Sequence, residues 1–115
     1  MRAVIQRVSR ATVVINNEIT ASIGNGLVVM LGIAHSDNRR KAESIVHKIL
    51  ELRIFSDSEG KMNLSVQDVN GSILIISNFT VYADSTKGTR PNFSDAAKPI
   101  YAMPLYDYFE SQLPV

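Results

Sequence analysis

One stretch of the chain brings together small polar side chains that could bind and polarise a substrate. Ser77, Asn78 and Thr80 lie close together near the carboxyl end of an apolar segment, residues 72–82. In α/β proteins, ligand sites commonly form at the carboxyl ends of central strands. A nucleophilic threonine needs an adjacent general base, however, and none stands near Thr80 in the sequence. On spacing alone, the simpler interpretation is that these hydroxyls satisfy neighbouring strands.

The run His35, Ser36 and Asp37 contains the three side-chain types of a hydrolase triad. A triad is defined by how its groups meet in space, and adjacency in the sequence does not produce that geometry. Asp37 also precedes an apolar pattern of helical period, so we expect it to cap a helix.

A third candidate is a loop that mixes cations with aromatic rings. Lys87, Arg90 and Lys98 alternate with Tyr82 and Phe93. Cationic side chains bind phosphates and aromatic rings stack on bases, so this loop is a candidate RNA contact. An ordinary solvated loop is the simpler interpretation on this evidence alone.

The first half of the chain is expected to position these groups with strands and one helix. Residues 2–23 predict two or three strands, with Asn16 and Asn17 suited to the positive φ of a tight hairpin turn. Residues 27–34 are apolar at nearly every position, which predicts a strand buried on both faces. A helix is expected from Asp37 to about Leu50, because its apolar residues recur every three or four positions: Ala42, Ile45, Val46, Ile49 and Leu50.

The second half is expected to contain a short strand at residues 52–55, turns at 57–60 and 69–72, and the strand at 72–82. Alternation along that last strand places Ser77 on one face, and Asn78 with Thr80 on the other. A second helix is expected within residues 99–113. Pro104 either opens this helix or kinks it.

Composition excludes several classes of function. Twelve Lys and Arg against eleven Asp and Glu give a net charge of +1, which argues against a broad basic clamp but allows a local patch. The absence of cysteine excludes disulfides and thiolate chemistry, and two histidines argue against a histidine metal cage. We find no membrane span or cleavage site, so we expect a cytoplasmic protein.

These patterns predict a single domain over residues 1–115. Its class is α/β, with a strongly curved, barrel-like mixed sheet and two amphipathic helices.

Several segments together resemble one known family. They are MRAVIQRVSRATV at the start, GNGLVVMLGI in the buried strand, RIFSDSEGKMNLSV at residues 53–66, SNFTVYADSTKGTRPNFSDAA at 77–97 and LYDYF at 105–109. In this order they resemble the D-aminoacyl-tRNA deacylases, also called D-tyrosyl-tRNA deacylases, over essentially the whole chain.

The resemblance implies an esterase that acts in chiral proofreading of translation. Its substrates are D-aminoacyl-tRNA and mischarged glycyl-tRNA, from which it releases free tRNA and the amino acid. The family acts as a homodimer whose active site lies at the subunit interface, where a Gly-Pro loop of the partner excludes L-amino acids. Neither a metal, an organic cofactor nor a membrane is implied.

The resemblance also assigns roles to residues. Ser77, Asn78, Phe79 and Thr80 match the family's signature strand and would bind substrate, with Phe79 and Thr80 as the catalytic pair. Main-chain amides near these two residues would stabilise the developing oxyanion. Thr80 would position the substrate, because the chemistry is thought to use the RNA 2′-hydroxyl and a water.

Lys87, Arg90 and Phe93 are the expected tRNA contacts.

The chain departs from the family pattern in two places. The signature strand usually has Gln where this chain has Asn78, and the family's C-terminal Asn-x-Gly-Pro-x-Thr motif does not occur in these 115 residues.

Two other interpretations remain open. One is an RNA-binding module without catalytic activity that uses the loop at residues 87–93. The other is a structural dimer module without activity in this form. Hydrolysis of the aminoacyl ester separates both from an enzyme.

Overall fold

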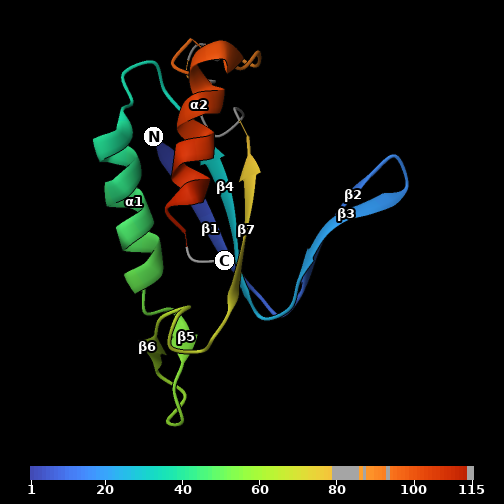
Figure 1. Ribbon diagram of the computed structural model, residues 1–115, viewed down its shortest axis with the longest axis vertical. Coiled ribbons are helices and arrows are strands. Elements are labelled where there is room, and N and C mark those ends of the chain that lie inside the picture. The colour runs from blue at the N-terminus through green and yellow to red at the C-terminus, as the bar shows by residue number, and fades with distance from the viewer. Residues whose placement is uncertain (79–85, 87, 93, 114–115) are drawn as a thin grey trace.

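The computed structural model describes residues 1–78, 86, 88–92 and 94–113. A three-stranded mixed sheet lies at its centre, in the order β1 (Arg2–Val8), β4 (Gly26–Gly32) and β7 (Ser72–Ser77). β4 runs antiparallel to β1 and parallel to β7 (Figure 1). The expected strand at 72–82 therefore exists as far as Ser77, and residues 79–82 lie outside the described part.

Two antiparallel pairs accompany this sheet. β2 (Ala11–Ile15) and β3 (Glu18–Ile23) form a hairpin, and β5 (Phe55–Ser56) pairs with β6 (Met62–Leu64). The hairpin turns at Asn16 and Asn17, whose φ angles of 52° and 63° confirm the predicted turn. A strand expected at 52–55 starts only at Phe55, because α1 (Arg39–Glu51) extends up to its C-cap Leu52.

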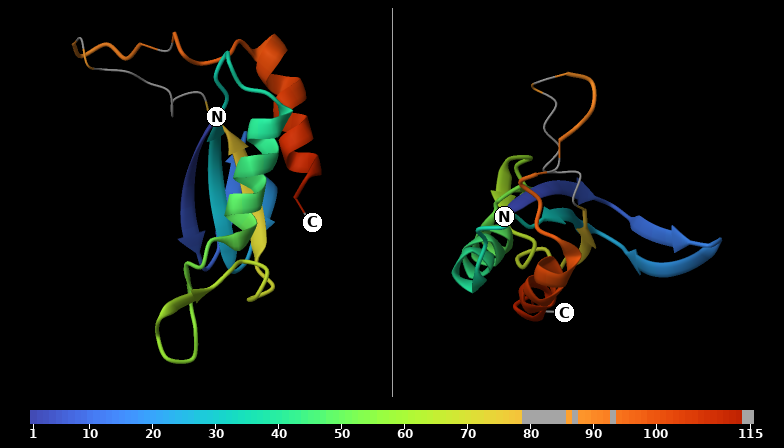
Figure 2. Two further views of the ribbon diagram at one scale, coloured as in Figure 1. Left: turned by 90° about the vertical axis from the view of Figure 1, so that its left-hand side faces the viewer. Right: turned by 90° about the horizontal axis from the view of Figure 1, so that it is seen from above.

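Both helices, α1 and α2 (Pro99–Ser111), cover the same face of the central sheet (Figure 2). The predicted apolar stripe of α1 is confirmed, since Ala42, Val46 and Ile49 are buried. The core also contains Leu27, Val29 and Leu31 of β4, and Phe109 and Leu113. Burying these side chains supplies the main favourable free energy of folding.

The start of α2 settles a choice that the sequence left open. Pro99 occupies the first turn, where a missing N–H costs nothing, and Pro104 lies inside the helix.

The other face of the sheet carries no helix among the described residues. Val28 and Met30 of β4 point to this outer face and are half-buried, whereas Leu27, Val29 and Leu31 are almost fully buried. The prediction that β4 is buried on both faces is therefore correct for one face only. Leu74 and Ile76 of β7 lie half-buried on the same outer face.

The α/β class and the two helices are confirmed. The barrel-like closure is not, because the strands of the described residues fall into three separate sheets. The β2–β3 hairpin leaves the central sheet beyond Val8 and extends away from it (Figure 1).

Candidate functional site

Four elements place their ends at one end of the molecule. The carboxyl ends of β4 and β7 lie there, and α1 and α2 both begin there (Figure 1). This arrangement follows from the parallel pairing of β4 with β7, because the intervening chain must return past the sheet. It is the end at which α/β proteins commonly bind ligands.

Backbone hydrogen bonds join the segments at this end. The N–H of Asn78 donates to the carbonyl of Leu31 at 2.9 Å, which fixes the exit of β7 against β4. The N–H of Ala97 donates to the carbonyl of Ile33 at 2.8 Å, and Ala34 pairs with Ala96. The chain before α2 is thus held over the end of β4.

Ser77 and Asn78 take up the positions that alternation predicts. Ser77 is exposed and pairs with Leu31 on the side of the sheet that the helices cover. Asn78 is half-buried on the outer face, where its amide Nδ2 donates to the Sδ of Met30 at 3.9 Å. The two side chains therefore lie on opposite sides of the strand end. Sequence reasoning did not identify Met30 as a neighbour, since it lies 48 residues away.

Of the other predicted site residues, the structure describes only one. Phe79, Thr80, Lys87 and Phe93 lie outside the described residues, so their roles stay predictions. Arg90 is described and its side chain is exposed.

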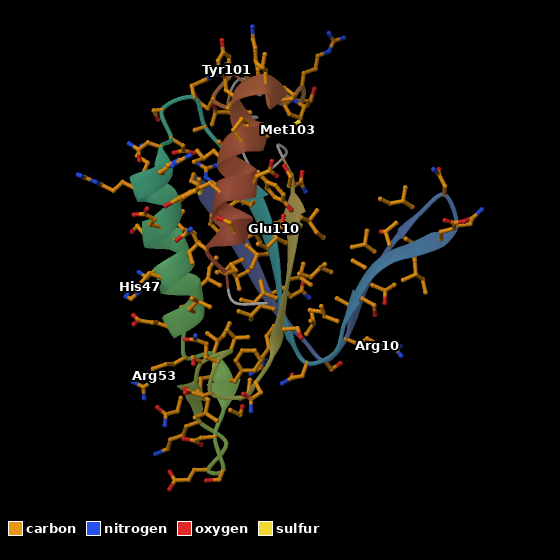
Figure 3. All side chains as sticks on the ribbon, in the orientation of Figure 1. Arg10, His47, Arg53, Tyr101, Met103 and Glu110 are labelled. Atoms are coloured by element: carbon orange, nitrogen blue, oxygen red, sulfur yellow. The ribbon has the colours of Figure 1, made fainter. Side chains whose placement is uncertain are left out.

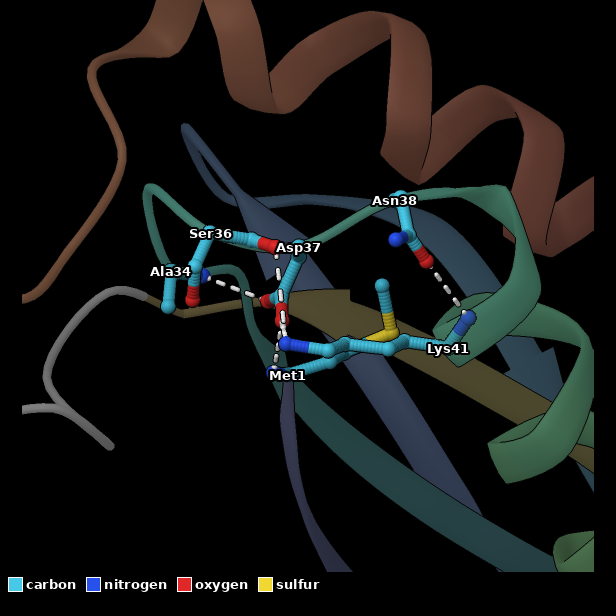
Figure 4. Close-up of polar contacts among 6 residues, drawn as sticks. All are labelled: Met1, Ala34, Ser36, Asp37, Asn38 and Lys41. Carbon is cyan, nitrogen blue, oxygen red and sulfur yellow. Dashed lines mark hydrogen bonds and ion pairs between the residues drawn. The ribbon is translucent and has the colours of Figure 1, made fainter.

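The His35–Ser36–Asp37 run does not form a triad. The Asp37 carboxylate accepts hydrogen bonds from the Met1 ammonium and, at 2.7 Å, from the N–H of Ala34 (Figure 4). Nε2 of His35 donates to the carbonyl of Ser94 at 2.6 Å. The His35 ring and the Asp37 carboxylate thus bond to different partners and not to each other.

Asp37 does not cap α1 either, which corrects the expectation. The N-cap is Asn38, whose Oδ1 accepts from the N–H of Lys41 at 3.0 Å (Figure 4). The Asp37 carboxylate instead forms an ion pair with the buried Met1 ammonium. Lys41 Nζ forms a second ion pair with the same carboxylate at 3.7 Å. No local pattern signals this pairing, because Met1 and Asp37 are 36 residues apart.

Tyrosines of α2 attach that helix to its neighbours. The Tyr106 hydroxyl donates to the carbonyl of Ile75 at 3.2 Å, two residues before Ser77, and burial raises the pKa of Tyr106. Tyr108 donates to the Glu43 carboxylate, and this hydrogen bond raises the pKa of Tyr108. The Arg39 guanidinium lies 4.6 Å from the centre of the Tyr108 ring.

Neither a metal site nor a membrane-spanning helix is found among the described residues. Those residues contain no group of three or more His, Asp or Glu side chains placed to hold a metal ion. None of their helices is long and apolar enough to cross a membrane.

Comparison with protein families gives a match over nearly the whole chain. Residues 4–114 match the family described as D-Tyr-tRNA(Tyr) deacylase. The chain belongs to this family. The resemblance inferred from the sequence segments is thereby confirmed.

Curated members of the deacylase family are identical to the chain at about half of the aligned positions. The D-aminoacyl-tRNA deacylase of Chloroflexus aurantiacus is 52% identical over 113 residues, which cover 98% of the chain and 71% of that protein. The D-aminoacyl-tRNA deacylase of Aliivibrio salmonicida is 54% identical over 109 residues, covering 95% and 76%. The chain thus spans about three quarters of the length of these deacylases.

Solved structures show the same fold. The c-Myc DNA Unwinding Element Binding Protein superposes with a TM-score of 0.93 at 41% identity, covering 98% of the chain and 76% of that protein. A probable eukaryotic D-amino acid tRNA deacylase superposes with a TM-score of 0.76 at 19% identity, covering 93% and 63%. At that lower identity the second likeness concerns the fold alone.

Proposed function

We propose that this chain is a D-aminoacyl-tRNA deacylase. It hydrolyses the ester of D-aminoacyl-tRNA and of mischarged glycyl-tRNA, releases free tRNA and the amino acid, and so proofreads chirality in translation. The observation that carries the proposal is the 52% identity to a D-aminoacyl-tRNA deacylase over 98% of the chain. Aminoacyl-tRNA is a cytoplasmic substrate, so we place the protein there.

Within this proposal, the reaction takes place where β7 ends. Ser77 and Asn78 bind the aminoacyl end, and Phe79 and Thr80 follow them directly in the chain. Main-chain amides of Phe79 and Thr80 donate to the carbonyl oxygen as it gains negative charge. Thr80 positions the substrate while a water, assisted by the RNA 2′-hydroxyl, attacks the ester carbon. The tRNA leaves with its terminal hydroxyl restored, and the amino acid leaves as the free acid.

We further propose that residues 1–115 are a single deacylase domain that works as a homodimer. The uncovered face of the central sheet supports a dimer, because it exposes apolar side chains that a second subunit would bury. Val4 is 45% exposed there, and Val28, Met30, Leu74 and Ile76 are half-buried. In this proposal a Gly-Pro loop of the partner completes each pocket and excludes an L side chain by its position. Residues 1–115 do not contain this loop, so the test below adds the segment that carries it in the family.

The test is catalytic turnover on D-Tyr-tRNA present in excess over protein. It uses the chain and also the chain joined to the C-terminal segment of the Chloroflexus relative, called here the joined protein. We expect several D-tyrosines released per joined protein, and slower release when the terminal 2′-hydroxyl is replaced by hydrogen. If both proteins bind tRNA but neither releases tyrosine from it, the proposed enzymatic activity would be refuted.

One observation favours a second candidate function. The solved structure that is 41% identical to the chain is named as a DNA unwinding element binding protein. A nucleic-acid-binding module without catalytic activity, using Lys87, Arg90 and Phe93, is therefore the alternative. It predicts binding of uncharged tRNA or DNA with no ester hydrolysis.

A further inference from the structure

We propose that the amino ends of α1 and α2 form a surface that binds the phosphates and an unpaired base of the tRNA acceptor arm. This surface, called here the cationic end, consists of Arg39, Arg40, Lys41, Lys98 and Tyr101. The inference rests on the proposed function, because it names where the RNA part of that substrate lies. Lys98 also belongs to the basic loop identified in the sequence, whereas Arg39, Arg40, Lys41 and Tyr101 do not.

The charge of this end is concentrated in the first turn of α1. Arg39, Arg40 and Lys41 are consecutive, and the turn contains no acidic residue. Cations at a helix amino end oppose the helix dipole and cost stability, so their presence favours a role in binding an anion. Asp37 already pairs with the Met1 ammonium and with Lys41 Nζ, which leaves Arg39 and Arg40 as the main cations of this turn.

The guanidinium of Arg39 is held in place before any ligand arrives. It stacks on the Tyr108 ring at 4.6 Å, and Tyr108 is itself fixed by its hydrogen bond to Glu43. A pre-positioned arginine loses less entropy when it binds a phosphate.

A hollow beside Arg39 offers a place for a base. It has a volume of about 460 Å³ and is lined by His35, Asp37, Asn38, Arg39, Tyr101, Pro104 and Leu105. Tyr101 is 71% exposed and stands where α2 begins (Figure 3). An exposed tyrosine beside an arginine is suited to stacking on an unpaired base, as in proteins that bind single strands.

The cationic end lies at the same end of the molecule as the candidate site. Both helices begin where β4 and β7 end (Figure 1). The segment leading into α2 is bonded to the end of β4 through Ala97 and Ile33, and Asn78 is bonded to the same strand through Leu31. An RNA whose 3′ end reaches Ser77 and Asn78 therefore passes close to these cations.

The first test measures binding of uncharged tRNA to the chain over a range of salt concentrations. In the double variant Arg39→Gln/Arg40→Gln, we expect the affinity for tRNA to fall roughly tenfold at low salt. The negative slope of log K against log salt should become shallower, its magnitude falling by about two. Arg40→Gln alone, which leaves the Arg39–Tyr108 stack intact, should decrease the slope by about one. The control is Lys48→Gln/Lys61→Gln, which removes two exposed cations away from this end and should change neither quantity. An unchanged slope in the arginine variants, or an equal decrease in the control, would overturn the inference.

The second test concerns the base contact. Tyr101→Ala should weaken tRNA binding severalfold without changing the salt slope, because stacking releases no counterions. Met103→Ala removes a comparably exposed side chain of the same helix, 63% against 71%, and should leave binding unchanged. Equal losses in the two variants would contradict a specific stack.

Hydrolysis separates this inference from the proposed function. Made in the joined protein, the arginine variants should hydrolyse D-tyrosyl-adenosine, which lacks the phosphates of the arm, at the parent rate, and D-Tyr-tRNA more slowly. Equal losses on both substrates would show damage to the site and overturn the inference. If neither the chain nor the joined protein, both without substitutions, hydrolyses either substrate, the proposed function fails. The binding measurements still decide whether the cationic end binds RNA.

Discussion

At the scale of single residues, the structure shows that the Asp37 carboxylate binds a distant partner instead of the helix amino end. Asp37 has the type and position of a helix cap, yet its buried oxygens face the Met1 ammonium and the Ala34 N–H. Asn38 takes the cap instead. The sequence could predict that a polar residue would begin the helix, but a contact spanning 36 residues could not be predicted from local spacing.

Asp37→Asn is expected to lower the free energy of unfolding by about 3 kcal/mol or more, because it leaves the buried Met1 ammonium without its counter-charge. Urea denaturation followed by circular dichroism measures the change. Asp95→Asn removes an exposed carboxylate nearby and serves as the control. Equal stabilities for the two variants would contradict this account of the pair.

Asp68 gives a prediction about pH. Its carboxylate accepts from the N–H of Ser65 at 2.9 Å, and this hydrogen bond holds the pKa of Asp68 below its ordinary 3.8. A lowered pKa in the folded state means that the stabilisation is complete above pH 3.8 and is lost as the pH falls through the folded value. Stability should therefore fall less steeply below pH 4 in Asp68→Asn than in the parent, as urea midpoints at several pH values would show. Parallel curves would be the contrary result.

Thr80→Ala tests whether this residue positions the substrate or attacks it. Loss of one positioning contact costs about 10²–10³ in rate, whereas loss of a true nucleophile costs roughly 10⁶. We expect the smaller loss on D-Tyr-tRNA, with the joined protein, and no burst of acyl-enzyme in rapid-quench measurements. A burst in the parent, or complete inactivation of a folded variant, would assign the nucleophile to Thr80.

At the scale of elements, features specified by local sequence were predictable. The turn at Asn16 and Asn17 and the apolar stripe of α1 depend on residues a few positions apart, and both are confirmed. The strand expected at 52–55 begins only at Phe55, because Leu52 is the C-cap of α1 and Arg53 and Ile54 join the helix to the strand. Barrel closure depends on how distant strands pair, which periodicity alone does not specify.

Gly26 is required where β4 first meets β7. A Cβ at this position would lie 1.9 Å from the carbonyl oxygen of Ser72, its partner across the two strands. Gly26→Ala should therefore separate the strands and lower the free energy of unfolding by roughly 3 kcal/mol or more. Gly24→Ala, where a Cβ meets nothing within 4 Å, should change it by no more than about 0.5 kcal/mol. Thermal unfolding of both variants provides the comparison, and similar midpoints would contradict the close approach.

At the scale of the whole molecule, the central sheet has an apolar face that no described helix covers, and a cationic end lies beside the proposed site. The positions of Ser77 and Asn78 at the end of β7 followed from strand alternation and are confirmed. The neighbours of that site were not predictable in the same way. Met30 comes from another strand, and in our proposal a partner subunit supplies the remainder.

The central claim is that this molecule removes amino acids from tRNA according to their chirality. The most direct measurement compares release from D-Tyr-tRNA, L-Tyr-tRNA and Gly-tRNA by the joined protein, with the chain alone in parallel. We predict that the joined protein cleaves the D-tyrosyl and glycyl esters and leaves the L-tyrosyl ester intact, because a fixed backbone loop excludes an L side chain by a steric clash. The chain alone should be inactive or should lose this selectivity. Equal cleavage of D- and L-tyrosyl esters by the joined protein, or equal selectivity in the chain alone, would contradict the account.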